Sequence, residues 1–226
     1  MKDSNWDGEL WLAKDYAVLH GALGVSAVHA HHAHQLILSP DMPASVALES
    51  RVITDTRIWI ESMCSHAILA PLASHYSVYA EPYAYNGQEL LASMEKTEPS
   101  LPTLMAALQT ATRKPVLDAR VETALAQVDR LLSGKISASK LADDVHVSLS
   151  QLERLFSAQL GLPVRRLVLW RRLRLAIATT LEGQNLTTAA HAAGFADSAH
   201  FSRTMRSMFG VRADHSISHM HLQLID

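Results

Sequence analysis

Four histidines stand within six positions of the stretch VHAHHAHQLIL, residues 28–38. Neutral imidazoles are frequent ligands of zinc and copper, and they also form hydrogen bonds at the walls of ligand pockets. Side chains alternate along a strand, so His29 and His31 share one face, while His32 and His34 share the other. At most two of the four imidazoles can therefore meet, and any site built on them needs partners from elsewhere in the chain.

The segments that must position these histidines have the pattern of a β-rich region. QLILS, SVALESRVI, RIWIE and HYSVYAEPY are short, rich in β-branched or aromatic residues, and separated by Pro, Ser and Asp. Two prolines in KTEPSLPT indicate a break, and beyond it the apolar residues recur at helical spacing. We therefore predict an α+β chain with separate domains: a β-rich domain over 1–95, a linker or dimerisation helix over 96–116, and an all-α domain over 117–226.

Composition narrows the class of protein. The net charge of −2 is uneven, with 7 Lys/Arg against 12 Asp/Glu in residues 1–116 and 13 against 10 in residues 117–226. A basic second half favours a polyanionic partner. The chain has one cysteine and no window as apolar as a membrane span, and its first residues are polar. We expect a cytoplasmic protein without a membrane partner.

The second half contains an internal repeat. SASKLADDVHVSLSQLERLFSAQLG (137–161) aligns with NLTTAAHAAGFADSAHFSRTMRSMFG (185–210), and Arg154 matches Arg203 at an offset of 49. Each copy predicts a capped short helix, a tight turn and a longer helix with one apolar face. This is the pattern of a helix-turn-helix, in which the second helix enters a major groove. The alternative is an all-α core whose polar face is only solvated.

A long helix is expected between the two copies, because PVRRLVLWRRLRLAIATTL (163–181) begins with a proline suited to a helix start. Its arginines, together with those of the second copy, are candidates for DNA phosphate contacts. Those we single out are Arg166, Arg171 and Arg206. The alternative is that the arginines pair with acidic side chains of the same chain.

The segment 117–217 resembles the DNA-binding domain of AraC-type transcription regulators, on the motifs LADDV…SLSQLERLFSAQLGLP…RRLRLA and AAHAAGFADSAHFSRTMRSMFG. The resemblance implies two recognition helices that present polar side chains to bases. These are Ser150, Gln151, Glu153 and Arg154 in the first, and Ser198, Ala199, His200 and Arg203 in the second. One departure is His146, which stands in the first turn where the family usually has Gly; a positive φ costs His more than Gly.

Regulators of this family commonly carry an N-terminal cupin-like sensor, and residues 20–90 resemble a short one. The resemblance makes His66 the partner of His29 and His31, while Gln35 replaces the usual glutamate ligand. We favour an effector pocket at these three histidines over a zinc or copper site, which would be the chain's cofactor. The apolar wall of this pocket is expected from Trp59 and from Leu36 or Leu38.

The resemblance implies a ligand-responsive transcription regulator that reads two adjacent major-groove segments of a promoter, and not an enzyme. Its expected partners are double-stranded DNA, a small-molecule effector, RNA polymerase if it activates, and a second copy of the chain. The competing class is a metal-dependent cupin enzyme whose α-helical domain serves for assembly. Duplex DNA binding by the faces at 150–154 and 198–203 distinguishes the two.

Overall fold

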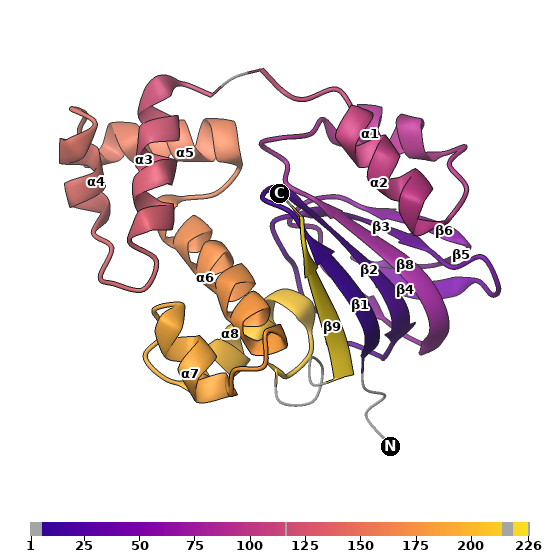
Figure 1. The fold of residues 1–226 in the computed structure, drawn as a ribbon. Coiled ribbons are helices and arrows are strands. Elements are labelled where there is room, and N and C mark those ends of the chain that lie inside the picture. The colour runs from indigo at the N-terminus through magenta and orange to yellow at the C-terminus, as the bar shows by residue number, and fades with distance from the viewer. Residues whose placement is uncertain (1–5, 116, 214–218, 226) are drawn as a thin grey trace. The chain divides into compact units, whose positions relative to one another are not determined.

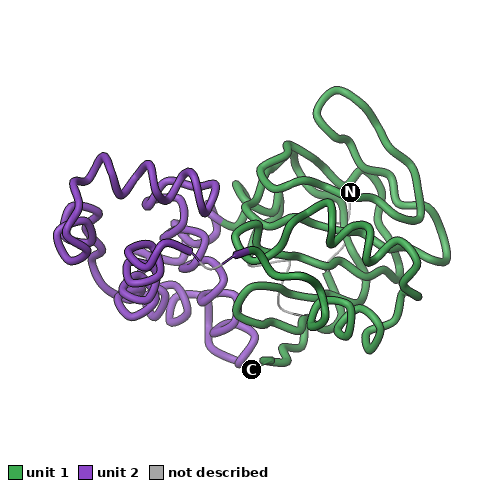
Figure 2. Tube along the Cα trace, turned by 90° about the horizontal axis from the view of Figure 1, so that it is seen from above, with its two compact units in different colours: residues 1–114, 205–226 green, residues 115–204 purple. Residues whose placement is uncertain are grey.

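The computed structural model of this chain describes residues 6–115, 117–213 and 219–225. The chain forms two compact units (Figure 2). Unit 1 comprises Met1–Lys114 and Met205–Asp226, and unit 2 comprises Pro115–Thr204. Strands fill most of unit 1 and helices fill unit 2, which confirms the predicted fold class.

Unit 1 contains two sheets. The strands before the helical unit are β1 (Asp7–Leu12), β2 (Tyr16–Leu23), β3 (His34–Leu38), β4 (Ala44–Leu48), β5 (Arg51–Asp55), β6 (Arg57–Ile60), β7 (His66–Ile68) and β8 (Leu72–Ala80). The larger sheet has the order β6-β3-β8-β2-β1-β9, and the smaller has the order β5-β4-β7. The segment that bears the four histidines leads into β3, so its C-terminal end is held by the larger sheet.

The last strand of the larger sheet comes from the half of the chain that we predicted to be all-helical. β9 (His219–Leu224) runs parallel to β1, with Leu10 opposite Leu222 (Figure 1). HMHLQL has only a short run of alternation, which sequence periodicity did not separate from the preceding helices. Its partner strand lies about two hundred residues away, so the pairing that creates it is invisible to local patterns.

Two helices cover one face of the larger sheet (Figure 1). They are α1 (Gly87–Met94) and α2 (Leu101–Thr110), and the second lies in the segment predicted as a linker or dimerisation helix. Leu104 and Leu108 of α2 are fully buried beside Val18 and Val78 of the sheet. The apolar face of α2 is thus used within its own chain, because the packing partner lies next to it in sequence and in space.

Unit 2 is built from helices with short connections. They are α3 (Ala119–Arg130), α4 (Ala138–Asp144), α5 (Leu149–Leu160), α6 (Val164–Leu181), α7 (Leu186–Ala192) and the first part of α8 (Ser198–Phe209). Asp118, Ser137, Ser148 and Asn185 each accept a backbone hydrogen bond at the start of a helix. Among the described residues, no helix is both long and apolar enough to cross a membrane.

Candidate nucleic-acid interface and histidine cluster

The first helix-turn-helix consists of α4 and α5. Ser148 accepts a hydrogen bond from the backbone N–H of Gln151 at 3.2 Å and so fixes the start of α5. Leu152, Phe156 and Leu160 form the buried face of this helix. Because these positions are three or four residues apart, they leave the opposite face of α5 to solvent.

The second helix-turn-helix consists of α7 and α8 and has the same design. The Asn185 side chain accepts from Thr188 N–H at 2.9 Å, and the Asp197 carboxylate accepts from His200 N–H at 2.6 Å. Phe201 is fully buried, and its ring lies 5.6 Å from that of Phe195 in the preceding turn. The repeat inferred from sequence is therefore a structural repeat.

Both turns need a residue in the left-handed region. φ is +56° at His146 in the first turn and +79° at Gly194 in the second. The backbone conformation anticipated for His146 is therefore present, although an L side chain is strained there. At Gly194 a Cβ would also overlap the carbonyl oxygen of Leu132, so only glycine fits the second turn.

The predicted base-reading residues differ in how much surface they offer. Ser150, Arg154, Ala199 and Arg203 are exposed, whereas Gln151, Glu153, Ser198 and His200 are half-buried. Arg154 and Arg203 occupy equivalent positions of the two longer helices. These two arginines are the longest exposed hydrogen-bond donors of the repeated faces.

Glu153, predicted as a base contact, has a structural contact within unit 2 as well. Its carboxylate accepts a hydrogen bond, 3.1 Å long, from the backbone N–H of Val164. Val164 is the first residue of α6. A carboxylate at this place satisfies an unpaired N–H and stabilises the positive end of the helix dipole. Glu153 thus holds α5 to α6, and sequence spacing did not reveal it because the partner lies across a turn.

The arginines of α6 divide into two groups. Arg165 and Arg166 are exposed, as the phosphate-contact prediction for Arg166 requires. Arg171 is buried, with its Nε 3.8 Å from the Asp129 carboxylate of α3, so it has no surface to offer a phosphate. Its prediction as a phosphate contact is wrong, because the acidic partner on α3 could not be seen from the spacing within α6.

A groove of about 760 Å³ lies within unit 2, along the first half of α6. Its lining contains Lys135, Arg165, Arg172, His191 and His200, and no acidic residue. Lys135 and His191 were not predicted as site residues, although both are basic residues beside helix ends. A concave surface whose charged side chains are all basic concentrates positive potential where a polyanion can approach.

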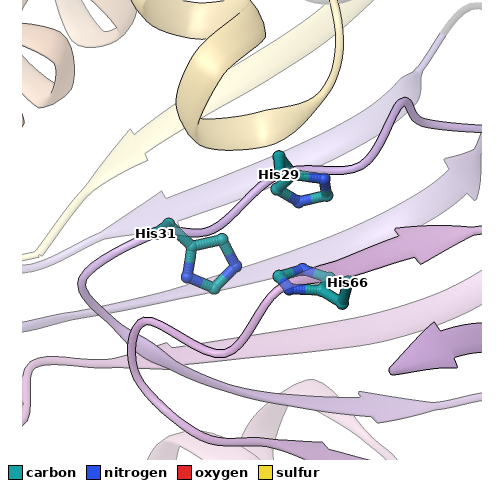
Figure 3. A group of neighbouring side chains, drawn as sticks. All are labelled: His29, His31 and His66. Atoms are coloured by element: carbon teal, nitrogen blue, oxygen red, sulfur yellow. The ribbon is translucent and has the colours of Figure 1, made fainter. Parts of the chain in front are cut away.

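The three histidines singled out in unit 1 come together (Figure 3). One ring nitrogen from each of His29, His31 and His66 lies within 4.8 Å of the others, and all three side chains are buried. His29 and His66 also exchange two backbone hydrogen bonds, N–H to carbonyl oxygen, at 2.9 Å each. The two chain segments are thus tied together at the point where the imidazoles meet.

The space beside this cluster is small. A cavity of about 10 Å³ borders His29 and His66, with Tyr79 and Phe209 among its walls. Organic ligands need pockets of about 300 Å³ or more. The cavity beside these histidines is therefore smaller than an organic molecule needs, and the effector-binding role of His29, His31 and His66 stays a prediction.

The predicted wall of that pocket also lies elsewhere. Leu36 and Leu38 belong to the apolar core under α1 and α2, and Trp59 packs against this same core. Trp59 also stacks on His34, with the ring centroids 5.3 Å apart. The alternation of side chains along a strand explains this separation, because neighbouring residues of a strand point to opposite faces of the sheet.

The remaining histidines of the opening stretch point to other partners. His32 lies 3.5 Å from the Glu81 carboxylate, and both side chains are buried. His34 lies 2.8 Å from the Glu61 carboxylate. The division of the four histidines into two pairs, expected from strand geometry, agrees with these contacts.

Comparison with known proteins supports the assignment of unit 2. Residues 141–215 match the family described as a helix-turn-helix domain. A structure of apo ToxT K231A from Vibrio cholerae covers 89% of this chain and 96% of its own, with 12% identity and a TM-score of 0.60. The comparison with curated proteins found no match.

Two further solved structures are similar. Wild-type ToxT from Vibrio cholerae, solved with a bound unsaturated fatty acid, covers 88% of this chain and 93% of its own, with 10% identity and a TM-score of 0.58. An AraC-type transcriptional regulator from Chromobacterium violaceum is 28% identical over 42% of this chain and 85% of its own, with a TM-score of 0.40. The first similarity extends over both units and shows a shared fold. The matched family shows a helix-turn-helix domain over residues 141–215, as the sequence resemblance predicted, and the similarity to ToxT shows that the chain shares the fold of that protein, including its β-rich N-terminal part.

Proposed function

We propose that α5 and α8 are the recognition helices and read two adjacent major-groove segments of a promoter. The observation that carries this proposal is the structural repeat, in which Arg154 and Arg203 project from equivalent positions of the two helices. Arginine forms bidentate hydrogen bonds with guanine in the major groove. Ser150, Gln151, Ser198, Ala199 and His200 complete the two reading surfaces.

Phosphate contacts supply most of the affinity in this proposal. Arg166 on α6 and Arg206 on α8 are exposed, and the basic groove along α6 adds Lys135 and Arg165. Contacts of this kind release counterions and make binding salt-dependent without choosing a sequence. They orient the recognition helices, while the two arginines select bases.

Unit 1 acts as the regulatory part of the protein, and it responds to a ligand rather than catalysing a reaction. A ToxT structure of the same fold was solved with a bound unsaturated fatty acid, which supports ligand sensing by proteins of this architecture. The regulator works in the cytoplasm, where promoter DNA and RNA polymerase are present. It pairs with a second copy if its operator contains two half-sites.

The test uses a duplex selected from a randomised library by the full-length parent protein. Arg154→Ala and Arg203→Ala should each weaken binding to that duplex by about 1–3 kcal/mol, because each removes a base-directed contact. Lys140→Ala is the matched control, since this exposed lysine of α4 pairs with Asp144 at 3.0 Å. Unchanged affinity in both arginine variants would show that the recognition helices are wrongly placed.

A further inference from the structure

We propose that His29, His31 and His66 bind a single transition-metal ion of the class that prefers imidazole, zinc(II) or copper(I). The three side chains come from two segments of unit 1, one leading into β3 and one starting β7. The inference does not depend on the DNA-binding proposal, since its test measures the metal alone.

The orientation of each ring favours coordination. The Nδ1 of His29 lies 2.9 Å from the Ala27 carbonyl oxygen, and that of His66 lies 2.9 Å from the Cys64 carbonyl oxygen. A neutral imidazole that donates through Nδ1 keeps its lone pair on Nε2. Histidines that bind metals are commonly held in this way by a carbonyl on the far side of the ring.

The rings are held in the neutral form that metal binding requires. Burial, with smaller contributions from the neighbouring imidazoles, lowers the pKa of His29 to about 4 and that of His31 to about 3. Burial also lowers the pKa of His66.

One buried ring nitrogen of the cluster is left unsatisfied among the described residues. The Nε2 of His66 has no hydrogen-bond partner, although the side chain is 2% exposed. An unsatisfied buried acceptor costs about 1–3 kcal/mol. An ion that takes this lone pair would offset that cost.

His31 lies between two carbonyl oxygens, that of Ala33 at 2.9 Å from Nδ1 and that of the Gln35 amide at 3.1 Å from Nε2. A neutral imidazole has one N–H and can satisfy only one of them. The Gln35 amide nitrogen donates to Ser77 and Tyr79, at 3.2 Å each, which directs its oxygen toward His31. The ring nitrogen of His31 that does not donate keeps a lone pair, and this nitrogen is the atom that a metal ion would take.

The available space selects a single ion. The cavity of about 10 Å³ borders His29, Gln35 and His66 and can hold one ion or one water. A water can donate hydrogen bonds to only two of the three imidazoles, whereas an ion can accept a lone pair from all three. Zinc–nitrogen bonds of about 2.0–2.1 Å require nitrogens about 3.3 Å apart in a tetrahedron. Atoms within 4.8 Å of one another reach this spacing by small rotations of the rings.

The ligand set favours zinc or copper over magnesium and calcium. All three donors are neutral nitrogens, and hard cations prefer carboxylate, carbonyl and water oxygens. Gln35 stands close to His31 and adds one neutral oxygen instead of a negative charge. The site therefore suits an ion that imidazole binds well without help from an anion.

The experiment uses untagged full-length protein and two probes, zinc(II) and copper(I), each titrated against a chromophoric chelator. We expect one equivalent of at least one ion to bind. His31→Ala and His66→Ala should each weaken binding by more than about 100-fold, because even outer-shell partners of metal ligands contribute about 10- to 100-fold. His75→Gln is the matched control, because His75 is also fully buried in unit 1 but lies outside the cluster, and it should bind as the parent does.

A second measurement does not require the variants to fold. Cobalt(II) added to the parent protein should give the intense visible absorption of tetrahedral coordination, and zinc should raise the parent's melting temperature. Absence of binding by both probes would overturn the proposal. Binding that persists undiminished in His31→Ala and His66→Ala would overturn it as well, since the ion would then lie elsewhere.

Discussion

The two turns of the helical repeat offer a paired test of backbone strain. His146 and Gly194 occupy equivalent positions, and both have positive φ. His146→Gly should remove a left-handed strain of about 1–2 kcal/mol, while glycine adds about 0.5–1 kcal/mol of conformational entropy to the unfolded chain. The net expectation is a stabilisation of about 0.5–1 kcal/mol.

Gly194→Ala should have the opposite effect. The added Cβ meets the same backbone strain and also overlaps the Leu132 carbonyl oxygen, so the cost should exceed about 2 kcal/mol. Thermal unfolding of the full-length protein, followed by helical circular dichroism, measures both changes. We expect His146→Gly to raise the transition by about 1–4 °C.

The two variants are compared with the parent in the same buffer and at the same concentration. DNA binding by His146→Gly serves as the control for an intact fold, because the exposed His146 is not among the proposed base contacts. A His146→Gly protein no more stable than the parent, or a Gly194→Ala protein as stable as the parent, would refute this account of the turns.

Three other predictions concern single side chains. Arg166→Ala should lower the salt dependence of DNA binding by about one counterion, whereas Arg171→Ala should keep that slope and lower stability; equal slopes in both variants would contradict the division of these arginines. Glu153→Ala should destabilise the protein by about 0.5–2 kcal/mol through loss of its bond to Val164 in denaturant unfolding, and an unchanged midpoint would remove its structural role. Burial lowers the pKa of His75 from 6.5 to about 4, so the unfolded chain binds its proton first and stability falls as pH drops from 6.5 toward 4. His75→Gln should reduce that slope by up to about 1.4 kcal/mol per pH unit, and parallel pH profiles of variant and parent would contradict the assignment.

Local signals predicted the helical repeat well. The cap residues Ser137, Ser148 and Asn185 and the apolar spacing of each helix act over a few positions, and the structure has them where the sequence indicated. The fold class followed from the change in periodicity near residue 100. His29 and His31 meet apart from His32 and His34, as predicted, but the strand expected over all four begins only at His34, so alternation along a strand is not the cause.

Features that depend on distant partners were not predictable. Glu153 caps a helix that begins eleven positions later, and Arg171 is buried against an acid on another helix. The volume beside the histidine cluster is set partly by Phe209, whose ring lies 5.4 Å from that of His31 although the two are far apart in sequence. No pattern within a short window carries this information, so the volume of this cavity could not be predicted from the sequence.

The pairing of β9 with β1 has a consequence for how the protein is made. Asp7 pairs with His219, so the larger sheet needs residues from both sides of the helical unit. During synthesis β1 emerges first, and its outer edge stays open until all of unit 2 has been translated. Exposed strand edges pair readily with other chains. A nascent or shortened chain that lacks β9 is therefore the form most exposed to aggregation, and completion of the sheet coincides with completion of the DNA-binding domain.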